Sequence, residues 1–518
     1  MKKIQTKDDL DRMTKKLRFL SANEKSDRVM NLIEEAIENS YRLKHSKAIV
    51  NLYELKIKQL FENKEAIPVI NKTLQNMKSL SEEIDYLGGL VLCYSIEWGL
   101  EKFKGNRIKS RDAIHKAMDL LETANELDSY VYNVSRYSFA LEIWLENHDF
   151  KSACILEDCV SFFLKEKNYK GLIHSLGYLS IIYSHSQNRQ KAIKTAQRII
   201  SSKIDFSILP REFQAIAYFF VGVAFKLESL FTRARDFFLK AKHIFEQNNL
   251  IYSQYYIPTL SHLLAVKALL GDLKSSYKEI ERVECLLEDD SYKSLFDKFN
   301  ENQIKHTFNL TKFYILSRIS EIEKTKNRDL VSRILKGCKV YHSNFMFLSE
   351  FIRSNTLSNE DLKEMFCMDN FSINRVKHII RFMLEKQDFT SKINKEQRIL
   401  NCIDILKDQL KSNKTTFIEN SYSDLLIARQ LFSLKRFAEI YPLLRKYEKQ
   451  LHRIEVLELR IFMEAFIQMG AYKSGDPLGP ALQYLAIKKC RTYGFSRLES
   501  ILLNYLEIQK QEVLGLVV

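Results

Sequence analysis

Apolar residues recur every three or four positions along most of this chain, and short polar clusters interrupt them. The segment 218–225 shows the pattern clearly, with Tyr218, Val221 and Phe225 at helical spacing. Such spacing places apolar side chains on one side of an α-helix, whereas a half-buried strand would show strict alternation. The pattern therefore predicts an all-α fold in which amphipathic helices alternate with short turns.

The same spacing returns about every 40 residues, which is a period typical of repeat proteins. Each occurrence has large residues around a small one in its first helix, and a small residue in its second helix. The small residues of the second helices are Ala113, Ala153, Ala192, Ala234 and Ser276. Small side chains let two helices approach closely, and large ones fill the space between units. We therefore expect five successive helix pairs.

The best repeat resembles the tetratricopeptide pattern W-x2-L-G-x2-Y followed by A-x3-F. This chain has Y-x2-V-G-x2-F at 218–225 and A-x3-F at 234–238. Its units are longer than the standard repeat of about 34 residues, and Asn248 and Asn249 stand where that repeat often has proline. The resemblance implies a superhelical solenoid of antiparallel helix pairs, in which the first helices line a groove for a partner.

The repeat pattern weakens at both ends of the chain. We expect a charged helical cap at 1–45, repeats at 46–290, an irregular helical segment at 291–420, and further helix pairs with a capping helix at 421–518. Only 6 prolines and 14 glycines occur in 518 residues, which is well below ordinary usage. This scarcity favours long helices over strands and loops.

Charge and motifs narrow the class of function. The chain carries 80 basic and 65 acidic residues, a formal charge of +15, which allows an acidic partner but is typical of solvated helix faces. No phosphate-binding or hydrolase motif occurs, and the histidines and cysteines lack zinc-ligand spacing. We therefore expect a non-catalytic protein without cofactor or metal.

The start of the chain is charged, and no stretch approaches the ~18 apolar residues of a membrane span. We therefore expect a cytoplasmic protein. The eight cysteines form no CxxC pair, so we interpret them as reduced residues of the core.

In the tetratricopeptide family, the groove residues flank the packing positions of the first helix. The resemblance to that family therefore indicates candidate partner-binding residues in two units of this chain. The resemblance points to His174, Ile181, Ser184, His185, Phe219, Val223 and Lys226. Their apolar side chains, together with the ammonium of Lys226, suit an acidic-hydrophobic segment of a protein or peptide. The alternative is that Ile181 and Val223 only pack between units.

A second interpretation concerns residues 357–381, which loosely resemble a helix-turn-helix. Residues available for a nucleic-acid groove are Asn374, Arg375, Lys377 and Arg381. The bulky Phe366 argues against this interpretation, because a small residue normally lets two such helices cross. The sequence thus favours a protein-binding scaffold or adaptor, with a cytosolic peptide-responsive regulator or a nucleic-acid-binding regulator as alternatives. The loop Gly475 to Gly479 is a further candidate binding element.

Overall fold

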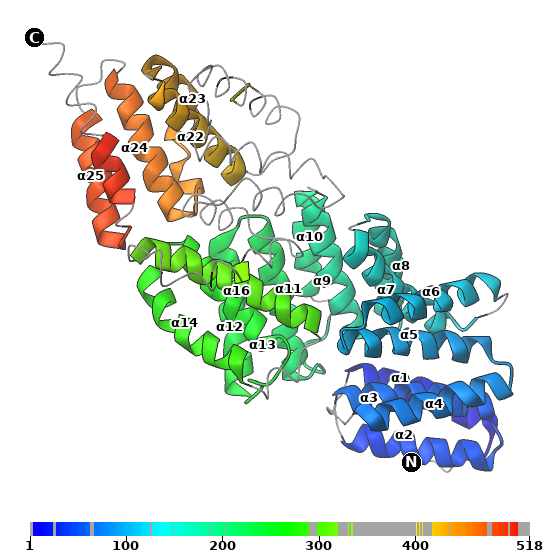
Figure 1. Cartoon of the computed structure of the whole chain (residues 1–518). Helices are drawn as coiled ribbons and strands as arrows, with labels where there is room; N and C mark the ends of the chain where they lie inside the picture. Colours follow the sequence, from blue (N-terminus) through cyan, green and yellow to red (C-terminus); the bar gives the residue numbers. More distant parts are fainter. Residues whose placement is uncertain are drawn as a thin grey trace, which may run out of the picture. The chain divides into compact units, whose positions relative to one another are not determined.

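The computed structural model describes most of the chain (Figure 1). The described residues are 4–23, 27–62, 67–124, 127–147, 149–186, 188–201, 204–289, 298–319, 417–434, 436–473, 479–495 and 498–505, with 330, 333–334, 400, 403–404 and 407. In this part of the chain every regular element is a helix and no strand occurs. The predicted all-α class is therefore confirmed for the residues described.

The chain divides into two compact units. Unit 1 takes the described residues of Met1–Leu227, Leu239–Tyr256 and Ser294–Phe299, and unit 2 takes those of Glu228–Phe238, Ile257–Lys293 and Asn300–Val518. Much of the predicted segment 291–420 lies outside the described residues, although 298–319 are described and helical; the helix-turn-helix candidates and the loop residues 475–478 lie outside them altogether.

Unit 1 is built from consecutive helices of similar length. They are α1(Lys7–Asn23), α2(Asp27–Arg42), α3(Ser46–Glu62), α4(Ile67–Glu83), α5(Leu87–Phe103), α6(Arg107–Thr123), α7(Ser129–Asn147), α8(Lys151–Lys165), α9(Tyr169–His185), α10(Arg189–Ile199) and α11(Arg211–Leu227). Each helix packs against the next one along the chain. Helix α3 also contacts α5, α5 contacts α7, α7 contacts α9, and α9 contacts α11. We call α3, α5, α7, α9 and α11 the first-helix layer.

The small residues predicted for the second helices lie inside these pairs. Ala113 in α6, Ala153 in α8 and Ala192 in α10 are all buried. Each side chain is small enough to let its helix approach the preceding helix of the first-helix layer. The packing positions expected from the repeat pattern are therefore confirmed in unit 1.

A common turn joins many of the helices. One residue with positive φ follows the helix, and the next residue donates its N–H to a carbonyl five positions back, as in Asn106 to Glu101 and Asn168 to Phe163. This arrangement satisfies carbonyls that the helix end leaves unpaired. The left-handed residue is Gly105 in the first turn but Lys167 in the second, so the turn does not depend on glycine.

Asparagine and aspartate side chains then start the following helix. Asn106, Asn168, Asn188 and Asp272 each accept a hydrogen bond from the backbone N–H three residues later. Such caps satisfy one of the donors that a helix N-terminus leaves free. The turn and the cap together explain why helices of similar length follow one another so closely.

Two apolar clusters fill the part of unit 1 from α1 to α7. The first joins α1, α2 and α3 through buried side chains that include Leu10, Leu17, Ile33 and Leu52. The second extends from α3 to α7 and includes Ile57, Leu92, Trp98 and Ile114. Helix α3 contributes to both clusters, so the segment expected to cap the array shares a core with the first repeat.

Unit 2 continues with helices. They are α13(Tyr256–Leu269), α14(Leu273–Glu288), α16(Lys298–Ile319), α22(Phe417–Ser433), α23(Ile440–Glu448), α24(Leu457–Lys473) and α25(Gly479–Tyr493), with 3-10 turns at Phe437–Glu439 and Leu451–Arg453. Helix α12(Phe231–Gln247) divides between the units, and Tyr256, Lys298 and Phe299, at the starts of α13 and α16, belong to unit 1. An ion pair of 2.8 Å between Lys267 and Glu279 links α13 to α14. Among the helices described here, none is long and apolar enough to cross a bilayer.

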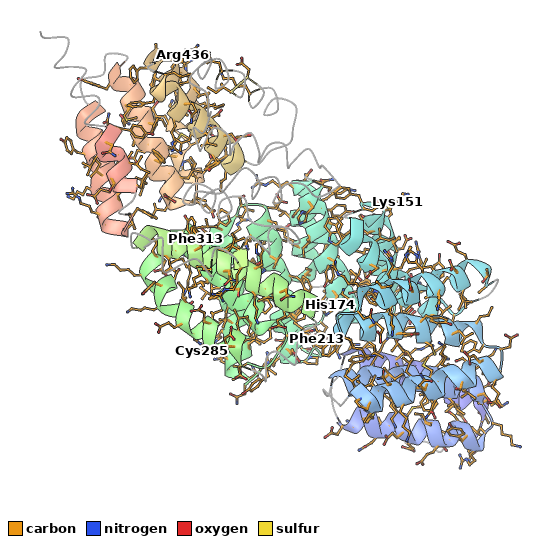
Figure 2. The ribbon with its side chains drawn as sticks, in the orientation of Figure 1. Lys151, His174, Phe213, Cys285, Phe313 and Arg436 are labelled. Atoms are coloured by element: carbon orange, nitrogen blue, oxygen red, sulfur yellow. The ribbon has the colours of Figure 1, made fainter. Side chains whose placement is uncertain are left out.

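The cysteines fit the sequence expectation only in part. Cys93, Cys159 and Cys490 are buried, whereas Cys154 and Cys285 are exposed, and none of these five forms a disulfide (Figure 2 labels Cys285). The expectation of core cysteines is therefore wrong for Cys154 and Cys285, whose positions face solvent. The remaining cysteines at 338, 367 and 402 lie outside the described residues.

Candidate functional site

Helix α9 presents a partly exposed stripe. His174, Ile181, Ser184 and His185 all lie on this stripe, while most other residues of the helix are buried. Positions 174, 181 and 185 are separated by whole numbers of helical turns, and 184 is next to 185, so the four residues lie on one side of the helix. The structure thus brings the four predicted residues of α9 together on the least buried side of that helix.

The three predicted residues of α11 lie inside the protein instead. Phe219, Val223 and Lys226 are only 7%, 8% and 9% exposed. Phe219 packs against Tyr255, with ring centroids 5.3 Å apart. Burial lowers the pKa of the Lys226 ammonium to about 8. These positions therefore contribute to packing and leave little surface for a partner.

His174 sits in an aromatic enclosure. Its ring meets Phe220 edge-on at 5.5 Å and Phe213 at 6.3 Å, and its Nδ1 lies 3.4 Å from the Tyr255 hydroxyl. Figure 2 labels His174 and Phe213. Burial, with a smaller contribution from the charge of Lys170, lowers the pKa of His174 to about 4. The imidazole is therefore neutral at pH 7 and acts as a packing residue.

At the other end of the stripe, His185 joins a small aromatic surface. Its ring centroid lies 5.4 Å from that of Trp144, which lies 5.9 Å from that of Phe150. Trp144 is buried, but Phe150 is 46% exposed. A partly exposed aromatic group beside Ile181 gives this end of α9 an apolar surface of the kind that partner segments contact.

A polar interface that the sequence did not reveal lies on the first-helix layer. Helix α1 contacts α3 and α9, and its Arg18 reaches the start of α7. Arg18 Nη1 donates to Asp128 at 2.8 Å, and the guanidinium lies 4.1 Å from the centroid of the Tyr130 ring. An arginine that pairs with a carboxylate and also stacks on an aromatic ring makes a contact that a lysine cannot reproduce.

The residues around Arg18 are held by bonds of their own. The second oxygen of Asp128 accepts from the Tyr130 backbone N–H at 2.8 Å, at the start of α7. The Tyr130 hydroxyl donates to Glu54 at 3.1 Å and accepts from Lys58 Nζ at 2.8 Å, and Lys58 also pairs with Glu54. Helices α3 and α7 thus fix both groups that Arg18 contacts.

Electrostatics match this arrangement. Burial opposes ionisation of Asp128, but the Arg18 guanidinium and the Tyr130 N–H outweigh it, so the pKa of Asp128 lies below its ordinary value. Asp128 is therefore a carboxylate at neutral pH, opposite a guanidinium that is always charged. The pair is only partly exposed, with 13% of the Arg18 side chain and 37% of the Asp128 side chain accessible.

The last turn of α1 meets the turn between α8 and α9. The Asn23 amide accepts from the Tyr169 backbone N–H at 3.1 Å and donates to the Lys167 carbonyl at 2.9 Å. Lys170 Nζ and the Gln59 amide donate to Ser21, at 3.3 Å to its carbonyl and 3.1 Å to its hydroxyl. Asn23 therefore satisfies one of the N–H groups that the start of α9 leaves free.

A cavity of about 280 Å³ lies elsewhere, between α4 and α5. Its walls include Leu74, Cys93 and Leu100, with Lys78, Glu97, Glu101 and Lys104 around them. Each of these lysines pairs with one of the glutamates, so the opening has no net charge. Burial raises the pKa of the Cys93 thiol to about 12, which removes it as a nucleophile at neutral pH.

The part of the chain that the structure describes holds no candidate metal centre. No group of three His, Cys, Asp or Glu side chains is arranged to hold a metal ion there. The alternative nucleic-acid residues Asn374, Arg375, Lys377 and Arg381 lie outside the described ranges.

Comparison with known proteins adds no assignment. A scan against models of protein families gives no match to this chain, and a search of curated proteins gives no similar sequence.

Proposed function

We propose that this chain is a non-catalytic scaffold of the helical-repeat kind, which holds a helical segment of a partner protein on its first-helix layer. The observation that carries the proposal is the position of α1. This helix packs against α3 and α9, and its polar side chains bond to α3, to α9 and to Asp128, the residue before α7. The layer thus already accepts one helix.

Physical considerations support a binding role. Arrays of helix pairs expose an extended surface on which an amphipathic helix can bury its apolar side and place its polar anchors. In this proposal the array is a superhelical solenoid of the tetratricopeptide kind, in agreement with the buried Ala113, Ala153 and Ala192. The stripe on α9 from His174 to His185 is one partly accessible area of the layer.

A site-specific cross-linking experiment tests the proposal. A photoreactive phenylalanine analogue replaces Ile181 on the α9 stripe, and a matched variant carries it at the exposed Gln197 on α10. Irradiation of the cells that make the protein should attach one defined protein to the Ile181 variant and none to the Gln197 variant. Equal labelling from both positions, or nucleic acid attached to Ile181, would contradict the proposal.

A further inference from the structure

The two sides of α1 differ in chemistry. Leu10 and Leu17 are fully buried in the apolar cluster with α2 and α3. Toward α7 and α9, in contrast, the helix offers Arg18, Ser21 and Asn23, which make hydrogen bonds and an ion pair. Apolar burial holds one side of the helix, while charge and geometry hold the other.

The groups that receive Arg18 do not depend on α1 for their position. Asp128 is fixed by the backbone of Tyr130, and the Tyr130 hydroxyl is fixed by Glu54 and Lys58. We call Asp128, Tyr130 and Glu54, together with the backbone of Lys167 and Tyr169, the arginine seat. A binding site that is organised before its ligand arrives loses less conformational entropy on binding, and so gains affinity.

The polar character of this interface makes exchange feasible. If the segment from Arg18 to Asn23 lifts, it uncovers charged groups, a tyrosine edge and backbone groups, which water can hydrate, and it gives up one partly buried apolar contact, that of Leu20 with the cluster. Leu10 and Leu17 can meanwhile stay in the apolar cluster. Release of the last turns of α1 therefore costs much less than removal of the whole helix.

We infer that the arginine seat is the docking site for the partner helix, and that α1 fills it as an internal ligand until such a helix displaces Arg18 and Asn23. This inference rests on the proposed scaffold function. The partner helix carries an arginine for Asp128 and Tyr130, and an asparagine five residues later, at its C-terminal end, for the start of α9. A cationic helix differs from the acidic segment expected from the sequence, because Lys226 is buried whereas the seat offers the carboxylate of Asp128.

A fluorescent peptide with the sequence of residues 7–23 serves as the probe for the seat. In the wild-type chain α1 occupies the seat and weakens binding of the peptide. The full-length double variant Arg18→Ala, Asn23→Ala vacates the seat and should bind the peptide about tenfold more tightly, or more. Addition of Asp128→Asn, which keeps a capping side chain but removes the charge, should return the affinity to the wild-type level.

Matched controls distinguish binding at the arginine seat from non-specific binding of the peptide. A peptide carrying alanine in place of Arg18 should bind no variant better than it binds wild type. If the double variant fails to fold, Arg18→Lys keeps the charge but loses the planar stacking on Tyr130, and should give an intermediate affinity. Equal peptide affinity of wild type and the folded variant used would overturn the inference.

Failure of this inference is distinct from failure of the scaffold proposal. A protein that cross-links at Ile181 but binds wild type and the double variant equally would leave the scaffold function standing. The arginine seat would then be only an internal contact. Tighter binding of that protein to the double variant supports the internal-ligand role.

Discussion

Replacement of His174 by phenylalanine should make unit 1 more resistant to acid. The imidazole has an ordinary pKa of 6.5, and burial lowers it to about 4 in the folded chain. Between these pH values the unfolded chain binds a proton that the folded chain does not, so the stability of the folded state decreases as the pH falls. Phenylalanine fills a similar volume and binds no proton.

The two pKa values set the size of the effect. Their difference corresponds to about 3 kcal/mol of unfolding free energy, reached when the pH falls from 7 to about 4. This free energy is an upper bound, because the His174 ring is partly exposed and solvent screens part of its charge. Lys170, one turn earlier on α9, adds to the cost of protonation, whereas Phe213, Phe220 and Tyr255 offer no anion.

Urea unfolding of wild type and His174→Phe, followed by circular dichroism at several pH values, measures this difference. The two proteins should differ little at pH 7, apart from the lost contact with the Tyr255 hydroxyl. The wild type should then lose stability faster as the pH falls through 6 and 5. Other titrating groups are common to both proteins and cancel in the comparison. Parallel curves from pH 7 to 4 would refute the assigned burial of His174.

Four further substitutions test helix packing, a turn and the burial of a lysine, each by urea unfolding against wild type. Gly177→Ala places a methyl group 2.5 Å from the Phe220 ring and should lower the free energy of unfolding by about 1–3 kcal/mol. Gly99→Ala is the control, because its methyl group meets no atom within 4 Å and should raise the free energy of unfolding by about 0.5–1 kcal/mol. Equal effects of the two substitutions would contradict the close approach of Gly177 to Phe220. Lys44→Gly relieves a φ of 51° and should stabilise by roughly 0.5–1 kcal/mol; a loss would contradict the left-handed turn. Burial lowers the pKa of Lys226 from 10.5 to about 8, so between these values the unfolded chain binds a proton that the folded chain does not. Wild type should therefore gain stability relative to Lys226→Met as the pH rises from 8 to 10. Parallel plots of unfolding free energy against pH would contradict the burial of Lys226.

Local pattern was sufficient to predict helices and their tight contacts. Ala113, Ala153 and Ala192 are buried as expected, because a small residue at a fixed offset in an amphipathic helix leaves few other arrangements. The asparagine caps at 106 and 188 were not predicted, although they too depend on residues only three positions apart. These features depend on residues a few positions apart, which a sequence displays directly.

The candidate site was harder to predict. Helix α11 is apolar on nearly every side, so spacing alone could not separate a groove position such as Phe219 or Val223 from a packing position. The arginine seat could not be predicted from the sequence, because Arg18 and Asp128 lie 110 positions apart and neither stands in a recognisable motif. Contacts of that range depend on how successive helix pairs turn, which no short pattern specifies.

The bond between Asn23 and Tyr169 also sets an order of events during synthesis. The two residues are 146 positions apart, so at ordinary translation rates α1 waits on the order of 10 s before the start of α9 is made. During that interval Leu10 and Leu17 can be covered by α2 and α3, which follow immediately. The nascent chain can therefore shelter the apolar surface of α1 early, while Arg18 and Asn23 stay hydrated until α7 and α9 emerge.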